Sequence, residues 1–313
     1  MHFLPSALRI VLAFLLIFAS TLLHVTPLFA LTLAKAILPF SPVRRAIDPL
    51  LTGIAESWVG FNNRMIDLFT RTRVRVHGPG DLRRDGHYLV LANHQGWVDI
   101  PILQKVFNRR IPLLRFFLKS QLFWVPLLGL AWWALDFPFM KRYTREQLAR
   151  RPELAGRDIE ATRRACERFR HIPVSVMNFV EGTRFTEAKH AAQRSPYRHL
   201  LKPKSGGVAF VIDAMGDGLQ AILDVTIAYP GGRPTLLDLF GGRIDEVHVH
   251  LRELSIPREF VGGDYQGDEA FRARFQAWIN ARWSEKDALL STLLGAGEED
   301  RNTKVTTKTL GRD

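Results

Sequence analysis

The chain has 313 residues, of which 47% are hydrophobic, and this is enough for one large domain with appendages. Its single cysteine excludes an internal disulfide, and no group of cysteine and histidine residues has zinc-ligand spacing, so we expect no metal site. The formal net charge of +12 predicts an anionic partner, which is either nucleic acid or the surface of an anionic membrane.

An apolar segment over residues 10–34 is the first element along the chain, and only His24 and Pro27 interrupt it. It is long enough to cross about 30 Å of hydrocarbon, and the arginines at 44–45 that follow it are typical of a cytoplasmic flank. A cleaved signal peptide is the alternative, but the apolar run is long and shows no clear cleavage pattern. Residues 1–40 are therefore predicted to anchor the chain in the inner membrane, either by spanning it or by turning back near Pro27, with the remainder on the cytoplasmic face.

Residues 41–72 are predicted to form an amphipathic helix, because their apolar side chains recur at helical spacing. These side chains are Ile47, Leu50, Leu51, Ile54, Trp58, Met65, Ile66 and Phe69. A helix of this kind lies along a membrane interface or against the core domain. Together with the apolar segment before it, the helix favours anionic membrane lipids over nucleic acid as the partner of this basic chain, which carries no nucleic-acid-binding motif.

A histidine follows a strand-like apolar run at residues 88–92. Gly96 can supply a turn and residues 100–107 can continue as a helix, which places His94 on a strand-to-helix loop, where sheet enzymes expose catalytic groups. Asp99 can hold one ring nitrogen of His94 and leave the other nitrogen to take a proton from an alcohol. The alternative is a surface histidine near a helix-capping aspartate.

A second strand-like run, residues 174–179, is also followed by a polar loop. In this loop Gly182 allows close backbone approach, Thr183 offers a hydroxyl donor and Arg184 offers a planar fork suited to phosphate oxygens. A turn with a capping threonine is the alternative interpretation. Two strand-loop units of one domain, one with a base and one with phosphate ligands, favour acyl transfer onto a phosphorylated glycerol.

Three further stretches bear on the organisation of the chain. Residues 122–140 are apolar and contain three tryptophans, and they form either ordinary core or a wall for an acyl chain. His248 and His250 fit a strand that turns both histidines outward, which we prefer to a metal site. Residues 295–313 are polar and charged, and we expect this tail to be disordered.

The chain resembles the glycerolipid (PlsC-type) acyltransferase family, which includes 1-acyl-sn-glycerol-3-phosphate acyltransferases and carries four ordered sequence blocks. These blocks match residues 93–99, 137–142, 179–184 and 224–230 in that order. The surroundings of the third block are similar to the branch that holds YihG-like bacterial enzymes. Two positions depart from the family pattern: Asp136 replaces a glycine that often opens the second block, and Val180 replaces a common proline in the third.

The resemblance implies roles for individual residues. His94 would be the general base and Asp99 its orienter, with no covalent acyl-enzyme. The residues that would bind the acceptor phosphate or shape its site are Arg142, Glu181, Gly182, Thr183 and Arg184. The two departures bear on loop shape and leave this assignment intact.

The resemblance further implies one α/β domain over residues 73–294, with a mixed sheet flanked by helices. The expected reaction transfers a fatty acyl group from acyl-CoA or acyl-carrier protein to the sn-2 hydroxyl of lysophosphatidic acid, giving phosphatidic acid. No cofactor is expected beyond this acyl donor. Another lysophospholipid is the alternative acceptor, and a non-catalytic, membrane-bound lipid-binding protein is the alternative of another class.

Overall fold

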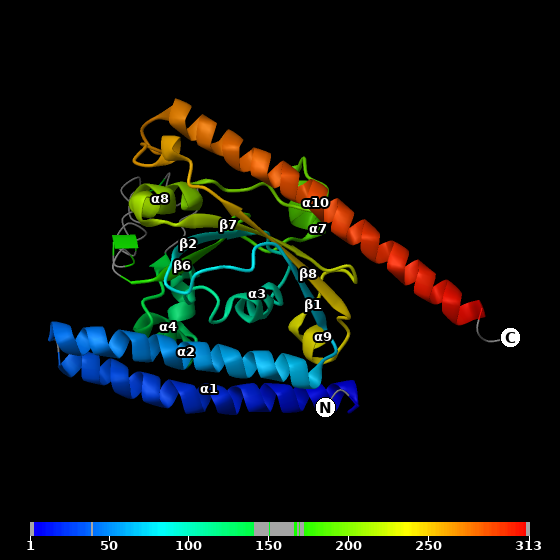
Figure 1. Ribbon diagram of the computed structural model, residues 1–313, viewed down its shortest axis with the longest axis horizontal. Coiled ribbons are helices and arrows are strands. Elements are labelled where there is room, and N and C mark those ends of the chain that lie inside the picture. The colour runs from blue at the N-terminus through cyan, green and yellow to red at the C-terminus, as the bar shows by residue number, and fades with distance from the viewer. Residues whose placement is uncertain are drawn as a thin grey trace.

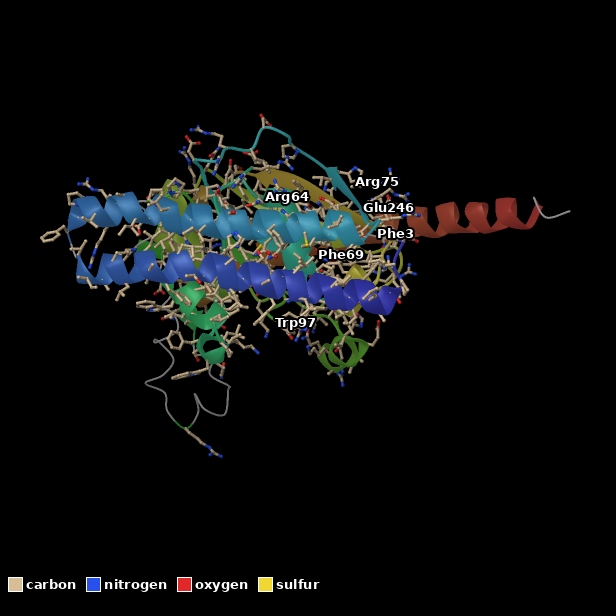
Figure 2. The ribbon with its side chains drawn as sticks, turned by 90° about the horizontal axis from the view of Figure 1, so that it is seen from below. Phe3, Arg64, Phe69, Arg75, Trp97 and Glu246 are labelled. Carbon is tan, nitrogen blue, oxygen red and sulfur yellow. The ribbon has the colours of Figure 1, made fainter. Side chains whose placement is uncertain are left out.

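The computed structural model describes residues 3–38, 40–140, 150, 166–167, 169 and 172–310, with the backbone alone for Met140 and for residues 296–310. Two long helices, α1 (Ser6–Ile37) and α2 (Ser41–Phe69), come first. They run antiparallel along one side of the molecule (Figures 1 and 2). Within the described residues, α1 alone is long and apolar enough to cross a membrane, judged by length and composition.

A six-stranded sheet forms the centre of the described chain, in the order β1-β8-β7-β2-β6-β3. Its strands are β1 (Arg73–His77), β2 (His87–Ala92), β3 (Leu114–Phe116), β6 (Val174–Phe179), β7 (Ala221–Ala228) and β8 (Glu246–Leu254). Neighbouring strands pair in parallel except β7 and β8, which are antiparallel. The predicted mixed sheet is therefore confirmed.

Helices cover both faces of this sheet. On one face lie α3 (Asp99–Phe107), α9 (Leu236–Phe240) and the α1–α2 pair, and on the other lie α8 (Gly206–Met215) and α10 (Glu269–Leu310) (Figure 1). The central strands are apolar on both sides because both sides are buried. In β2, for example, Val90 packs under α3 whereas Leu89 and Leu91 join the core under α8 and α10.

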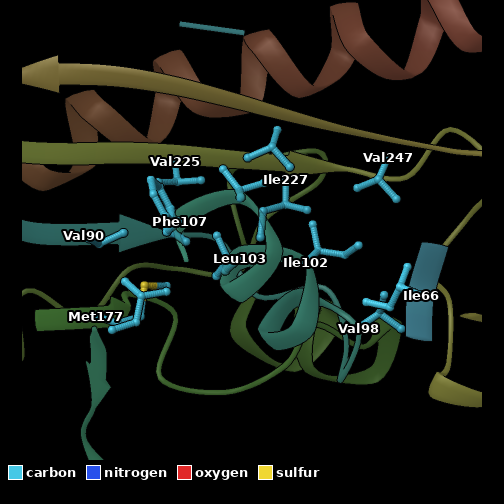
Figure 3. Packing of buried hydrophobic residues seen from close by; sticks show 14 of the residues in the cluster. Ile66, Val90, Val98, Ile102, Leu103, Phe107, Met177, Val225, Ile227 and Val247 are labelled. Atoms are coloured by element: carbon cyan, nitrogen blue, oxygen red, sulfur yellow. The ribbon is translucent and has the colours of Figure 1, made fainter. Parts of the chain in front are cut away.

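The core beneath α3 is drawn in Figure 3. Ile102 and Leu103 of α3 are fully buried against Val225 and Ile227 of β7. Because α3 begins at Asp99, this packing fixes the end of the helix that carries one of the predicted catalytic residues.

A third apolar cluster joins the α1–α2 pair to a segment that follows β3 and precedes β6. That segment contains β4 (Leu118–Lys119), η1 (Ser120–Trp124), α4 (Leu128–Ala134) and β5 (Phe139–Met140), and β4 pairs with β5. Val25 and Leu28 of α1 are buried with Leu51 of α2 and Ala131 of α4. The remaining short elements are α7 (Glu187–Gln193), η3 (Gly216–Gly218) and η4 (Arg258–Phe260).

A buried ion pair holds α10 against the sheet. Lys286, which is fully buried, donates from Nζ to Asp224 Oδ1 and to the carbonyl oxygen of Val225, each at 2.6 Å. Arg252 of β8 binds the other Asp224 oxygen at 2.6 Å. Removing one member would leave a buried charge uncompensated, so this network fixes the helix in register.

The backbone of α10 runs to Leu310. The disordered tail predicted for residues 295–313 stays a prediction. The polar composition of this stretch gives it little to bury, but it contains no proline to end the helix. The predicted strands at 88–92 and 174–179 and the helix at 100–107 are confirmed as β2, β6 and α3.

Candidate active site

His94 and Asp99 are brought together by the turn between β2 and α3. His94 Nδ1 lies 2.8 Å from Asp99 Oδ2, and Asp99 is fully buried. A carboxylate only accepts hydrogen bonds, so the imidazole proton sits on Nδ1 and Nε2 is left as an acceptor. No hydrogen bond from the described residues reaches Nε2. The pair thus has the geometry of a base and its orienter.

Four donors converge on the Asp99 carboxylate. Besides His94, the backbone N–H groups of Gln95 and Gly96 donate to Oδ2 at 2.6 and 2.9 Å, and the hydroxyl of Tyr229 donates to Oδ1 at 2.7 Å. Burial, and then the charge of Asp99, raise the pKa of Tyr229, so its hydroxyl keeps its proton. These donors compensate the buried charge of Asp99.

Glu181 connects the loop after β6 to the loop after β2 through hydrogen bonds. Its Oε1 accepts from the backbone N–H of His94 and its Oε2 from that of Leu201, both at 2.9 Å, and the side chain is fully buried. Burial raises the pKa of Glu181 to about 7, against the opposing effect of these two backbone donors. Both oxygens are engaged with backbone, so Glu181 shapes the site by positioning the residue that carries the imidazole.

Two further contacts fix the His94 loop. The buried side-chain amide of Asn93 exchanges two 2.9 Å hydrogen bonds with the backbone of Ile227, and so continues the pairing of β2 with β7. The ring of Phe179 stacks on the imidazole with a centroid distance of 3.8 Å and an interplanar angle of 11°. The Phe179 ring therefore covers one face of the imidazole, and Asp99 holds the ring at Nδ1.

The predicted phosphate-binding residues Gly182, Thr183 and Arg184 lie on the loop after β6. Gly182 has a φ of 68°, and a Cβ there would lie 3.1 Å from the Lys204 side chain, so glycine suits both the turn and the close approach. Thr183 Oγ1 accepts from Lys189 Nζ at 2.8 Å. The loop is thus bordered by two lysines.

Arg184 is stacked rather than ion-paired. Its guanidinium carbon lies 4.0 Å from the centroid of the Trp97 ring, on the loop after β2. Among the described residues, no carboxylate forms an ion pair with Arg184. Stacking holds the guanidinium plane while its N–H groups remain available for an anion.

Sequence reasoning missed three residues of this site. Lys189 and Lys204 add positive charge beside Thr183 and Gly182, and Tyr229 completes the ligands of Asp99. Lys189 and Lys204 stand in the stretches that follow the third block, and Tyr229 stands in the fourth block, so position relative to the blocks was the available signal. Arg142, predicted to contact the acceptor phosphate, lies outside the described residues.

The chain is similar in sequence to known proteins. Residues 73–230, half of the chain, match the family model described as Acyltransferase. The chain is 27% identical over 251 residues to lysocardiolipin acyltransferase 1 of Danio rerio, covering 76% of this chain and 60% of that protein. It is 29% identical over 217 residues to 1-acyl-sn-glycerol-3-phosphate acyltransferase gamma of Mus musculus, covering 65% and 52%.

These relatives are longer than the region they share with this chain, which spans little more than half of each. A solved structure, that of the 1-acyl-sn-glycerophosphate (LPA) acyltransferase PlsC from Thermotoga maritima, is also similar. It has a TM-score of 0.49 and 17% identity, over 90% of this chain and 97% of that one.

Proposed function

Because the chain belongs to the acyltransferase family, we propose that it transfers a fatty acyl group from a thioester donor to the sn-2 hydroxyl of lysophosphatidic acid, forming phosphatidic acid. The observation that carries this proposal is the His94–Asp99 pair next to a guanidinium, that of Arg184, with no carboxylate partner among the described residues. A base and an anion site on adjacent loops are what a phosphorylated alcohol requires.

In the proposed reaction His94 acts as general base. Its Nε2 takes the proton of the acceptor hydroxyl as the alcohol oxygen attacks the carbonyl carbon of the thioester. The tetrahedral intermediate then collapses, the carbon–sulfur bond breaks, and the imidazolium returns the proton to the leaving thiolate. Asp99 stabilises the imidazolium and keeps the ring in the productive tautomer.

The acceptor phosphate is proposed to bind at the loop after β6. Arg184 would supply a fork of N–H donors, and Lys189 and Lys204 would supply the charge that balances a phosphate dianion. Thr183 and Gly182 would allow the phosphate to approach the backbone closely. Arg142 is proposed to contribute to the same site by family resemblance.

A membrane position is supported by the outer face of α1. Large apolar side chains on this helix are exposed, namely Leu8, Val11, Phe14, Leu15, Leu16, Phe18, Leu22, Leu23, Leu33 and Ile37. Contacts near both ends of α1 hold it along the domain: Arg9 donates to the carbonyl oxygen of Gly241 at 2.5 Å, and Lys35 lies 4.0 Å from Asp136. We infer that the α1–α2 pair (Figure 2) embeds in one leaflet, on the cytoplasmic side of the inner membrane.

A second acceptor class has support from one relative. Lysocardiolipin acyltransferase 1 of Danio rerio is similar to 76% of this chain, so another lysophospholipid is the alternative acceptor. Both acceptors carry a phosphate next to the free hydroxyl, and the proposed residues would serve either one.

The test is acyl transfer by the purified full-length protein in detergent, with acyl-CoA and acyl-carrier protein offered separately. Each donor is paired with lysophosphatidic acid and with a panel of other lysophospholipids. We expect product from the wild type and none from His94→Ala. Turnover by pure His94→Ala at the wild-type rate would refute the mechanism, and retention of lipid without any product would identify a non-catalytic lipid-binding protein.

A further inference from the structure

A cavity of about 490 Å³ opens beside the candidate active site. Its walls come from four parts of the chain: the loop after β2, the end of β7 with the loop that follows it, the segment before Leu200, and the part of α10 near Leu290. The residues that matter for its chemistry are Gln95, Arg198, His199, Arg233, Leu290 and Leu294. None of these belongs to the residues proposed above for the acceptor phosphate or for proton transfer.

Gln95 connects this cavity directly to the catalytic loop, since it follows His94 in the chain. Its side-chain oxygen accepts from Arg233 Nε at 2.9 Å, and its side-chain nitrogen lies 3.4 Å from the carbonyl oxygen of His199. A molecule in the cavity therefore lies against the residue next to the proposed base.

Two arginines give the cavity its positive charge. Arg233 stacks over Phe185 at 3.7 Å and forms an ion pair with Glu187 at 2.7 Å. Arg198 is exposed, and in the described part of the chain no carboxylate forms an ion pair with its guanidinium. Each arginine thus lines the cavity and has further N–H donors that can bind an anion.

The segment that carries Arg198 is fixed to α10. The backbone N–H groups of Arg198 and His199 donate to the two oxygens of Asp287 at 2.8 and 2.7 Å, and His199 Nε2 lies 3.0 Å from Ser291 Oγ. Burial is the largest cause that lowers the pKa of His199, so its ring is neutral near pH 7. The positive charge at this wall therefore comes from Arg198.

The other lining residues are Tyr229 and Ser291, apolar side chains, and the backbone of three glycines. Leu290 is buried and Leu294 half-buried on α10, and they face the Gly231–Gly232 turn, where a Cβ on either residue would meet no atom within 4 Å. A site with cations at its rim and an apolar wall suits a long ligand that has a phosphate at one end and a less polar arm.

The cavity adjoins α10, which lies across the sheet from the α1–α2 pair (Figure 1). With the α1–α2 pair in the leaflet, as proposed above, the α10 side of the sheet lies away from the lipid. A water-soluble carrier therefore fits the cavity better than a lipid headgroup does.

We propose that this cavity binds the phosphorylated pantetheine arm of the acyl donor, with Arg198 and Arg233 on its phosphate and the thioester directed past Gln95 to His94. The inference rests on the proposed function, since it places the donor of that reaction. Coenzyme A and acyl-carrier protein share this phosphorylated arm, and the experiment separates the two sources.

The experiment measures binding, which does not depend on turnover. Coenzyme A, unphosphorylated pantetheine and holo acyl-carrier protein are titrated calorimetrically into the full-length protein in detergent. The variant is Arg198→Ala, and the matched control is Arg258→Ala, an exposed arginine on η4. We expect Arg198→Ala to weaken binding of the phosphorylated carrier about tenfold, with Arg258→Ala unchanged and pantetheine equally weak in all three proteins.

Three results would overturn the proposal: equal affinity of the wild type and Arg198→Ala, an equal loss for pantetheine, or no binding of either phosphorylated carrier. In steady-state assays Arg198→Ala should raise KM for the donor and leave KM for the lysophospholipid unchanged, and the reverse pattern would assign the cavity to the acceptor. Failure of the proposed function would appear differently, as an absence of acyl product while coenzyme A binding still depends on Arg198.

Discussion

The hydroxyl of Tyr229 and the imidazole of His94 bind opposite oxygens of one buried carboxylate, at 2.7 Å on Asp99 Oδ1 and 2.8 Å on Oδ2. The Tyr229 hydroxyl is the donor that fixes Oδ1, and it acts together with the backbone donors on Oδ2 to orient the carboxylate toward the imidazole. Tyr229, which follows β7, is thus a positioning residue for the proposed base His94, which follows β2.

Tyr229→Phe removes this hydroxyl and little else. Loss of a hydrogen bond to a buried charge costs about 1.5–3 kcal/mol, so we expect kcat to fall roughly 10- to 100-fold with KM for both substrates unchanged. The control is Tyr197→Phe, since the Tyr197 hydroxyl lies 3.4 Å from the carbonyl oxygen of Asn280, away from the pair. A wild-type kcat in Tyr229→Phe would contradict the positioning role.

Asp99→Asn tests the tautomer of His94. The amide can present a donor to Nδ1 and so shift the imidazole proton to Nε2, where the base must be free, and we expect kcat to fall on the order of 10³- to 10⁴-fold. Circular dichroism should remain that of the wild type because the two side chains have the same shape. A loss of less than tenfold in a folded Asp99→Asn protein would show that orientation by the carboxylate is unimportant.

Glu181 should make stability depend on pH. Its pKa in the folded chain is about 7 against an ordinary value of 4.5, so between these pH values the folded chain binds more protons than the unfolded chain. The free energy of unfolding should therefore fall as pH rises through this window, by on the order of 3 kcal/mol from this group. Thermal melts of wild type and Glu181→Gln across pH 4–8 measure the difference, and parallel curves would contradict it.

Arg184→Ala should act on the acceptor phosphate. Since its guanidinium is proposed to bind this group, we expect KM for lysophosphatidic acid to rise roughly 10- to 100-fold with a smaller change in kcat. A monoacylglycerol, which has no phosphate, should be used equally poorly by wild type and variant. The same loss with both acceptors would show that Arg184 supports the loop and does not contact the phosphate.

The proposed placement of α1 in one leaflet predicts the topology of its ends. In a Cys166→Ser background, single cysteines replace Ser6 at the start of α1 and Ser41 at the start of α2. A membrane-impermeant maleimide should label both from the cytoplasmic side in sealed vesicles. Labelling of the two positions from opposite sides would mean that α1 crosses the membrane.

The local parts of the site follow from the sequence. Apolar runs of strand length followed by polar loops placed His94, Thr183 and Arg184 at the ends of β2 and β6, because the periodicity of a buried strand is a local property. The role of Glu181 was not predictable in the same way. Its two backbone partners, His94 and Leu201, are distant in the chain and become its neighbours only in the folded domain.

The length of an apolar helix predicted its placement less well than apolar runs predicted the strands. An apolar segment over residues 10–34 is compatible with a membrane span, but only tertiary contacts such as that of Arg9 with Gly241 show that the helix runs along the domain. The disordered tail at residues 295–313 was predicted from polar composition, which describes what a segment can bury and not whether its backbone is helical.

The pairing of β1 with β8 has a consequence for how the chain is made. β1 directly follows α2, yet Arg73 of β1 pairs with Glu246 of β8, which is translated much later. β2 likewise pairs with β6 and β7, which follow it in the chain. During synthesis, which delivers the N-terminal end first, the α1–α2 hairpin is complete while most of the sheet is still to be translated. The hairpin can therefore bind a lipid surface before the sheet has formed. The sheet, whose strand pairs are distant in the chain and form slowly, then assembles against the hairpin.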